Sequence, residues 1–222
     1  MNQVFKTVQP SDHRIALFSL GLAPVIIWSW INPHDRVTWW LESIPALAGL
    51  GLLWWYRGKF PLSTLLLGLI WAHCVVLLVG GHYTYAEVPL GEWLRELTGG
   101  TRNNYDKLGH FFQGFMPAIL ARELLLRKSP LGTTEWRPTS RWLGFICGSV
   151  PLAFSAFYEL LEWWAAELGG AEADAFLGTQ GYNWDTQSDM LLALIGATVA
   201  LLALSRAHDR SLCHLRASAQ AQ

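Results

Sequence analysis

Six long apolar runs limit what this sequence can fold into. They lie at about residues 15–31, 38–56, 61–79, 108–126, 142–164 and 186–205. Each run is close to the ~20 residues that a helix needs to cross ~30 Å of hydrocarbon. Buried helices of a soluble bundle are the alternative, but such helices rarely stay apolar on every face. We therefore expect an all-α polytopic membrane protein with six transmembrane helices in a single membrane domain, residues 1–222, with outer loops at 82–107 and 165–184.

The composition agrees with a membrane protein. Of the 222 residues, 52% are hydrophobic and 15% are charged, compared with about 25% charged in typical soluble domains. Most of the 13 tryptophans lie near the ends of the runs, where indole rings concentrate at the headgroup level of a bilayer. The net charge of −1 argues against a nucleic-acid partner.

The distribution of lysine and arginine predicts the orientation. If the amino terminus is inside, eleven of these residues fall in inner segments, while Arg122 lies within a run and is counted on neither side. The outer segments contain Arg36, Arg95, Arg102 and Lys107. Because cytoplasmic loops carry the excess of positive charge, both termini are expected to be cytoplasmic in a bacterial inner membrane. The first run has no small-residue cleavage site after it, so we expect an anchor and not a removed signal peptide.

Three pairs of acidic or imidazole side chains lie near the outer ends of the runs. The pairs are Asp106 with His110, Glu159 with Glu162, and Asp185 with Asp189. Members of a pair are three or four residues apart, so both project from one helix face. Such groups are costly inside a bilayer, so three pairs at one depth predict a functional site.

The residue types favour a divalent metal. Carboxylates with one or two imidazoles suit Zn, Mn, Fe or Mg, and helix bundles build such sites from facing helices. His110, Glu159 and Asp189 are the deepest candidates and are predicted to act as ligands or general bases. Further metal ligands are expected among His82, which enters at the same level, and Asp106, Glu162 and Asp185.

Anion recognition is a second hypothesis for the same place. The fourth and sixth runs present their amino-terminal ends outward, and helix N-termini favour phosphate. A phospholipid or isoprenoid-phosphate headgroup from the outer leaflet would meet Arg102 and Lys107, with Gln113 and Gln187 on or near the same faces.

Simpler roles stay open for several residues. Asp106 and Asp185 are also suitable helix N-caps, and Glu162 could extend to the membrane surface. Glu42, at the outer start of the second run, either joins the cluster or extends to the surface. His73 is expected to be a hydrogen-bonded packing residue.

Three other segments complete the expected organisation. Arg122 and Glu123 lie about 25 Å along the helix from Asp106, so we assign them to the inner surface, with roles in helix packing, an ion pair with another span or lipid contact. Residues 89–98 have the spacing of a short interfacial helix. The polar tail after residue 206 is expected to be mobile.

Several stretches resemble a family of bacterial inner-membrane proteins, the YjdF-like (DUF2238) proteins. The matching stretches are His82-Tyr-Thr-Tyr-Ala-Glu-Val-Pro89, Arg102-Asn-Asn-Tyr-Asp-Lys-Leu-Gly-His-Phe-Phe-Gln-Gly114, Arg122-Glu123, Tyr158-Glu-Leu-Leu-Glu-Trp-Trp164 and Gly178-Thr-Gln-Gly-Tyr-Asn-Trp-Asp-Thr-Gln-Ser-Asp-Met190. This chain has Tyr182 where the family pattern has Asp, so no ligand role is expected there. The Asp-Lys-x-x-His-Phe element is more distantly similar to VanZ-like membrane proteins. The resemblance implies a role in the bacterial envelope near the outer leaflet, and no particular reaction.

Three functional hypotheses follow from the sequence. The preferred one is an outward-facing, metal-binding pocket that acts on or holds a lipid-linked or cell-envelope substrate. The second is a small proton-coupled transporter, because intramembrane acids also serve such carriers. The third is a structural network in which the polar residues fasten the helices together.

Overall fold

The computed structural model describes residues 12–169 and 180–220, and these residues form helices without any strand. The elements are α1 (Asp12–Trp30), α2 (Arg36–Tyr56), α3 (Thr64–Tyr83), the 3-10 helix η1 (Tyr85–Glu87), α4 (Pro89–Thr98), α5 (Tyr105–Lys128), α6 (Trp142–Gly169) and α8 (Asp185–Gln220). The all-α prediction is thus confirmed for the described part of the chain.

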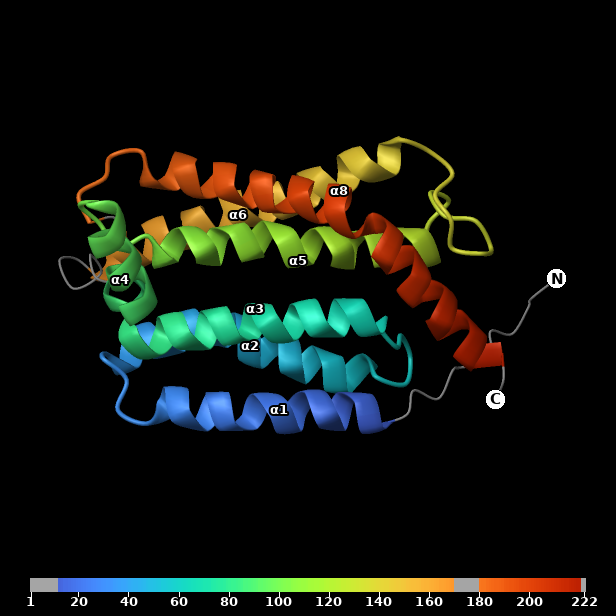
Figure 1. Cartoon of the computed structure of the whole chain (residues 1–222), viewed down its shortest axis with the longest axis horizontal. Helices are drawn as coiled ribbons and strands as arrows, with labels where there is room; N and C mark the ends of the chain where they lie inside the picture. Colours follow the sequence, from blue (N-terminus) through green and yellow to red (C-terminus); the bar gives the residue numbers. More distant parts are fainter. Residues whose placement is uncertain (1–11, 170–179, 221–222) are drawn as a thin grey trace.

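The long helices lie side by side along one axis, and α4 lies across one end of them (Figure 1). α3 packs against α1, α2 and α5, whereas α5 also packs against α6 and α8. α3 and α5 are therefore the central pair of the bundle. Polar side chains on α5 can face three other helices, and this position makes α5 the helix on which a site between helices is built.

Four helices are long and apolar enough to cross a membrane by length and composition: α1, α3, α6 and α8. Among the described helices, α2 and α5 have comparable lengths of 21 and 24 residues but fall below that apolar measure. α5 carries the charged residues Asp106, Lys107, Arg122, Glu123, Arg127 and Lys128 together with the polar His110 and Gln113. These side chains lower the mean hydropathy of α5, although this helix lies at the centre of the bundle.

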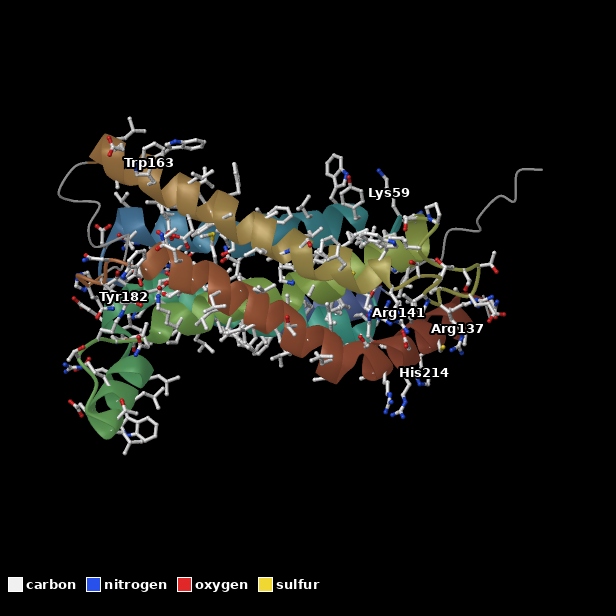
Figure 2. The ribbon with its side chains drawn as sticks, turned by 90° about the horizontal axis from the view of Figure 1, so that it is seen from above. Lys59, Arg137, Arg141, Trp163, Tyr182 and His214 are labelled. Atoms are coloured by element: carbon white, nitrogen blue, oxygen red, sulfur yellow. The ribbon has the colours of Figure 1, made fainter. Side chains whose placement is uncertain are left out.

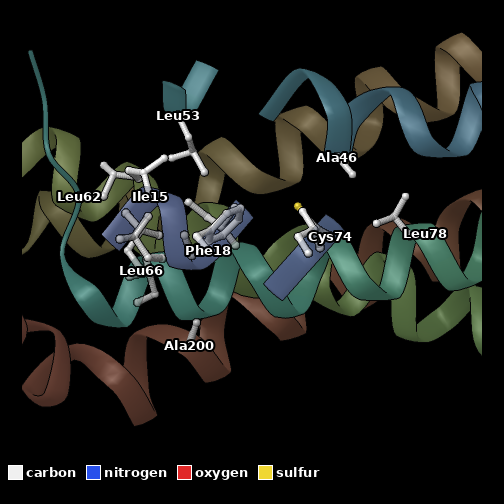
Figure 3. Close-up of a cluster of buried hydrophobic side chains, with 14 of the residues drawn as sticks. Ile15, Phe18, Ala46, Leu53, Leu62, Leu66, Cys74, Leu78 and Ala200 are labelled. Atoms are coloured by element: carbon white, nitrogen blue, oxygen red, sulfur yellow. The ribbon is translucent and has the colours of Figure 1, made fainter. Parts of the chain in front are cut away.

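Apolar side chains from distant parts of the sequence form the core between α1, α2, α3, α5 and α8. Ile15, Leu53 and Leu62 face one another at one end of this cluster, and Ala200 of α8 lies against α3 (Figure 3). Leu66 and Leu78 on α3 are fully buried. Burying a Leu side chain contributes about 1.5–3 kcal/mol where water is the reference. Between membrane helices the contribution comes from close packing instead.

Two short features follow from local sequence signals. The carboxylate of Asp35 caps α2 by accepting a hydrogen bond from the Thr38 N–H at 2.7 Å, and this bond lowers the pKa of Asp35.

The short helix predicted at 89–98 is present as α4, with Pro89 in its first turn and Gly99 in the left-handed conformation after its end. The exposed apolar side chains of α4 are Leu90, Trp93, Leu94 and Leu97.

α8 is longer than the sequence predicts. We expected a helix over 186–205 and a mobile tail after residue 206, but α8 continues to Gln220. Figure 1 shows its last part turning aside across the end of the bundle. His208, Leu212 and Leu215 are buried, and their spacing of four and three residues places them on one helix face. Leu212 packs in a cluster with residues of α5 and α6, which explains why the helix continues.

Candidate functional site

The contact between α5 and α8 is unusually close because glycine occurs on both helices. A Cβ at Gly114 would lie 1.7 Å from the carbonyl oxygen of Ala193, and one at Gly196 would lie 2.0 Å from the carbonyl oxygen of Phe111. Small residues allow membrane helices to approach in this way. His110 lies one turn before Gly114, and Asp189 lies one turn before Ala193. The glycine contact therefore brings the imidazole and this carboxylate together.

Three predicted ligands converge where α5 and α8 begin. One ligand atom each from Asp106, His110 and Asp189 lie within 4.8 Å of one another. Nε2 of His110 is 3.3 Å from Oδ1 of Asp106 and 3.8 Å from Oδ2 of Asp189. His110 and Asp189 are buried, and Asp106 is partly buried. Two carboxylates and one imidazole are a donor set that binds transition metals.

Gln113 controls the orientation of the imidazole. Its Oε1 lies 2.9 Å from Nδ1 of His110, so a hydrogen on Nδ1 is donated to the amide oxygen. A neutral His110 with this tautomer has its Nε2 lone pair on the side of Asp106 and Asp189, where only a proton or a cation can join it to the carboxylates. Metal-binding histidines are commonly held in this way by a hydrogen bond from the other ring nitrogen. Gln113, predicted as a cofactor-binding residue, thus lies in contact with His110.

α6 contributes two further carboxyl groups near His110, those of Glu159 and Glu162. Oε1 of Glu159 is 3.8 Å from Nδ1 of His110, and this buried oxygen has no hydrogen-bond partner among the described residues. Glu162 is near enough to Glu159 and His110 to interact with them electrostatically. A buried polar atom without a partner is costly, so Glu159 is oriented toward a place where a proton or cation would stabilise it.

Two cations neutralise part of this charge. Nζ of Lys107 lies 2.5 Å from Oδ1 of Asp189 and 2.6 Å from Oδ1 of Asp185, and Arg102 contacts the same Asp185 oxygen at 2.7 Å. Lys107 also donates to Ser188. Both cations therefore have carboxylate partners, which weighs against the headgroup-binding role expected for Arg102 and Lys107.

The structure adds two residues that the sequence did not assign to the site. Glu42 of α2 is buried, and its carboxyl group lies close enough to Tyr85 of η1, Asp106 and His110 to interact with them. The ring of Tyr85 fits against glycines of two helices, since a Cβ at Gly80 or Gly109 would lie 2.4 or 2.8 Å from it. The sequence left open whether Glu42 joins the cluster or extends to the membrane surface, and in the structure it joins the cluster. Tyr85 was missed, although it lies in one of the stretches that carry the family resemblance.

Two predicted residues do not join these groups. Nδ1 of His82 lies 3.1 Å from the carbonyl oxygen of Ser29, and its ring packs on Trp28 at 4.3 Å between centroids. Gln187 is exposed whereas Asp185 and Asp189 are buried, because two residues along a helix correspond to about 200° of rotation. His82 was proposed from its depth alone, and depth does not decide the direction of a side chain.

We refer to the assembled residues as the His110 cluster. It comprises Glu42, Tyr85, Arg102, Asp106, Lys107, His110, Gln113, Glu159, Glu162, Asp185 and Asp189. Six carboxyl groups in it face two permanent cations, an excess of four. This imbalance is the main electrostatic property of the cluster.

A second buried network lies further along α5. Glu123 is fully buried, and its carboxylate accepts hydrogen bonds from three groups. The donors are the Ser63 N–H at 3.0 Å, the Arg127 guanidinium at 2.7 Å and Nε2 of His208 at 3.0 Å. Arg122 contacts Nδ1 of His208 at 2.9 Å and Asp209 at 2.8 Å. We call these residues the Glu123 network. Of the roles proposed for Arg122 and Glu123, an ion pair with another helix is the one observed.

The family described as "Predicted membrane protein (DUF2238)" matches residues 14–210. The chain belongs to the DUF2238 family. "Inner membrane protein YjdF" of Escherichia coli (strain K12) is 46% identical over 194 residues, which covers 87% of this chain and 90% of that protein. No solved structure matches the chain.

Membership in the DUF2238 family confirms the resemblance that the sequence motifs indicated. Together with the apolar helices and the inner-membrane relative, it shows that the chain is a multi-pass protein of the bacterial inner membrane. The family match includes both the His110 cluster and the Glu123 network.

Proposed function

We propose that this member of the DUF2238 family holds a divalent metal in the His110 cluster and acts on, or holds, a lipid-linked or cell-envelope substrate there. The observation that supports this most directly is the convergence of Asp106, His110 and Asp189, whose ligand atoms lie within 4.8 Å of one another. Lys107 approaches Oδ1 of Asp189 and Oδ2 of Asp106. The other oxygen of each carboxylate faces Nε2 of His110.

The contrast with the Glu123 network supports a cation site. In that network Glu123 and Asp209 are matched by Arg122 and Arg127. A balanced, hydrogen-bonded set of this kind is suited to fastening helices. The His110 cluster instead has four carboxyl groups in excess, and Oε1 of Glu159 has no hydrogen-bond partner among the described residues. Buried excess charge needs a compensating cation or protons.

The donor set favours Zn, Mn or Fe over Mg. Mg binds through oxygen and water ligands, whereas imidazole suits the transition metals. A bound metal would supply Lewis acidity for a substrate oxygen. His110 would bind it through Nε2, and Glu159 would accept a proton from a substrate or water beside it. Gln113 would keep the imidazole in the required tautomer.

We further propose that α2 and α5 also cross the membrane, which makes six crossings with both termini in the cytoplasm. Both helices run alongside helices that are apolar enough to span (Figure 1). Lys59, Arg137 and Arg141 lie at the end of the bundle opposite Trp163 and Tyr182 (Figure 2). The positive charge at that end supports a cytoplasmic assignment. The His110 cluster would then face the outer leaflet.

Proton-coupled transport is less well supported. Such a carrier needs polar groups that continue between the two sides of the membrane. Between the His110 cluster and the Glu123 network, the facing positions of α5 and α8 include Ala118, Ala193, Ala197 and Ala200, all fully buried. Among the described residues, these alanines of the α5–α8 seam carry no group that could pass a proton.

The metal content of the purified protein tests the proposal. Elemental analysis should find about one transition metal per chain, and a chelator should lower the apparent melting temperature, because a ligand selective for the folded state stabilises it. Replacing Asp189→Asn should lower metal affinity by about tenfold or more.

Asp209→Asn is the matched control, because it makes the same change on the same helix outside the cluster. This variant should bind metal like the wild type. If wild-type protein and Asp189→Asn hold equally little metal after incubation with Zn, Mn and Fe, the metal proposal is wrong and a structural network remains.

A further inference from the structure

We propose a second ligand site, at the opposite end of the bundle from the His110 cluster, that binds an anionic phospholipid of the adjacent leaflet. A cavity of about 520 Å³ lies there between α1, α2, α3 and α5. This volume falls within the range of small-ligand pockets, roughly 300–1,000 Å³. None of the lining residues belongs to the His110 cluster or to the Glu123 network.

The walls of the cavity suit an acyl chain. They are almost entirely apolar and include Leu53, Leu67, Ile70, Met116 and Leu120. In Figure 3, Leu53, Leu62 and Ile15 border this region of the core. The cavity is partly open, and the exposed Leu52 of α2 and Leu124 of α5 are among its lining residues. In a membrane protein such an opening faces hydrocarbon, so lipid is the surrounding molecule that would enter it.

The polar lining residues suit an anionic headgroup. Four cations line the cavity, Arg14, Arg57, Lys59 and Lys128, and none of the described lining residues is acidic. Lys59 lies over the rings of Trp55 and Tyr56, and Lys128 over the ring of Phe60, at 5.6–5.9 Å from the centroids. Such aromatic rings are typical of the headgroup level. Basic pockets between membrane helices bind anionic lipid headgroups.

The chemistry therefore identifies the ligand class. The four cations select a negative charge, and the apolar walls select a hydrocarbon chain attached to it. Neither a free phosphate nor a neutral lipid satisfies both parts. This combination distinguishes the cavity from the His110 cluster, which is mostly acidic.

Lipid binding can be measured by native mass spectrometry in detergent, with phosphatidylglycerol and phosphatidylcholine that carry identical acyl chains. Wild-type protein should retain at least about tenfold more phosphatidylglycerol than phosphatidylcholine, since each basic residue contributes about 1 kcal/mol to the attraction of an anionic lipid. Inorganic phosphate at equal concentration should not displace the lipid. Arg14→Gln with Lys128→Gln should abolish the preference, whereas Arg137→Gln with Arg141→Gln should leave it unchanged.

A cavity-filling variant tests the apolar part. Gly49 lines the cavity, and a Cβ there would meet nothing within 4 Å, so Gly49→Phe should fold and exclude the lipid. Gly51→Phe is the matched control: a Cβ there is equally unobstructed, and Gly51 is not among the lining residues. Metal content should be unaffected in both variants, which separates this site from the proposed metal site.

Three results would overturn the proposal. One is equal retention of the two lipids by wild-type protein. Another is unchanged selectivity in the Arg14 and Lys128 double variant. The third is retention of phosphatidylglycerol by Gly49→Phe, because the lipid would then bind outside the cavity.

Discussion

The backbone of Gly114 on α5 lies against the carbonyl group of Ala193 on α8, so closely that a Cβ on the glycine would come within 1.7 Å of the carbonyl oxygen. The contact lies one helical turn from both His110 and Asp189. The distance between two candidate metal ligands therefore depends on the absence of a single methyl group.

Gly114→Ala should separate α5 from α8 and damage the His110 cluster. Overpacking of this kind costs about 1–3 kcal/mol of stability, and the bound metal should be lost together with it. A thermal melt and elemental analysis of the same sample measure both effects. In Gly148→Ala on α6 the new Cβ would meet nothing within 4 Å, so this control should keep its metal and melt at or slightly above the wild-type temperature. If Gly114→Ala melted at the wild-type temperature, the close contact between α5 and α8 would be contradicted.

Glu123→Gln should destabilise the protein without removing the metal. The substitution leaves Arg127 facing an uncharged partner in a buried place, and breaking a buried pair costs about 3–5 kcal/mol. Denaturant or thermal unfolding would show the loss, and elemental analysis would show normal metal content. Glu135→Gln, at an exposed position, serves as the control and should unfold like the wild type. Loss of metal from folded Glu123→Gln would mean that the two polar groups are coupled.

The proposed crossing of α5 can be tested with single cysteines. Cys213 is exposed, whereas Cys74 and Cys147 are buried, so Cys213→Ser removes the native exposed thiol. In that background Glu96→Cys, before α5, should react with a membrane-impermeant maleimide in intact cells. Glu135→Cys, after α5, should react only after the membrane is permeabilised.

The native Cys213 extends this test to the carboxyl terminus. It should react only in permeabilised cells if that end is cytoplasmic. Reaction of Glu96→Cys and Glu135→Cys from the same side of the membrane would exclude a crossing by α5 and, with it, the six-crossing arrangement.

The helical architecture was largely predictable, because long apolar runs are compatible with few other structures in a membrane. α4 was predictable from its spacing as well. The length of α8 was not, because the tail after residue 206 is polar on average. Its helix is stabilised by the burial of His208, Leu212 and Leu215, which depends on α5 and α6 being present beneath it.

The sequence by itself determined which side chains share a helix face, since a helical spacing of three or four residues places His110 above Asp106 and Asp189 above Asp185 whatever the surroundings. Only the tertiary structure decided which faces meet. It brought Glu42 and Tyr85 into the His110 cluster, directed His82 and Gln187 elsewhere, and paired Glu123 with His208. The physical reason is that the arrangement of helices depends on close packing at particular residues, such as Gly114 against Ala193, and the spacing along one helix contains no information about its neighbour.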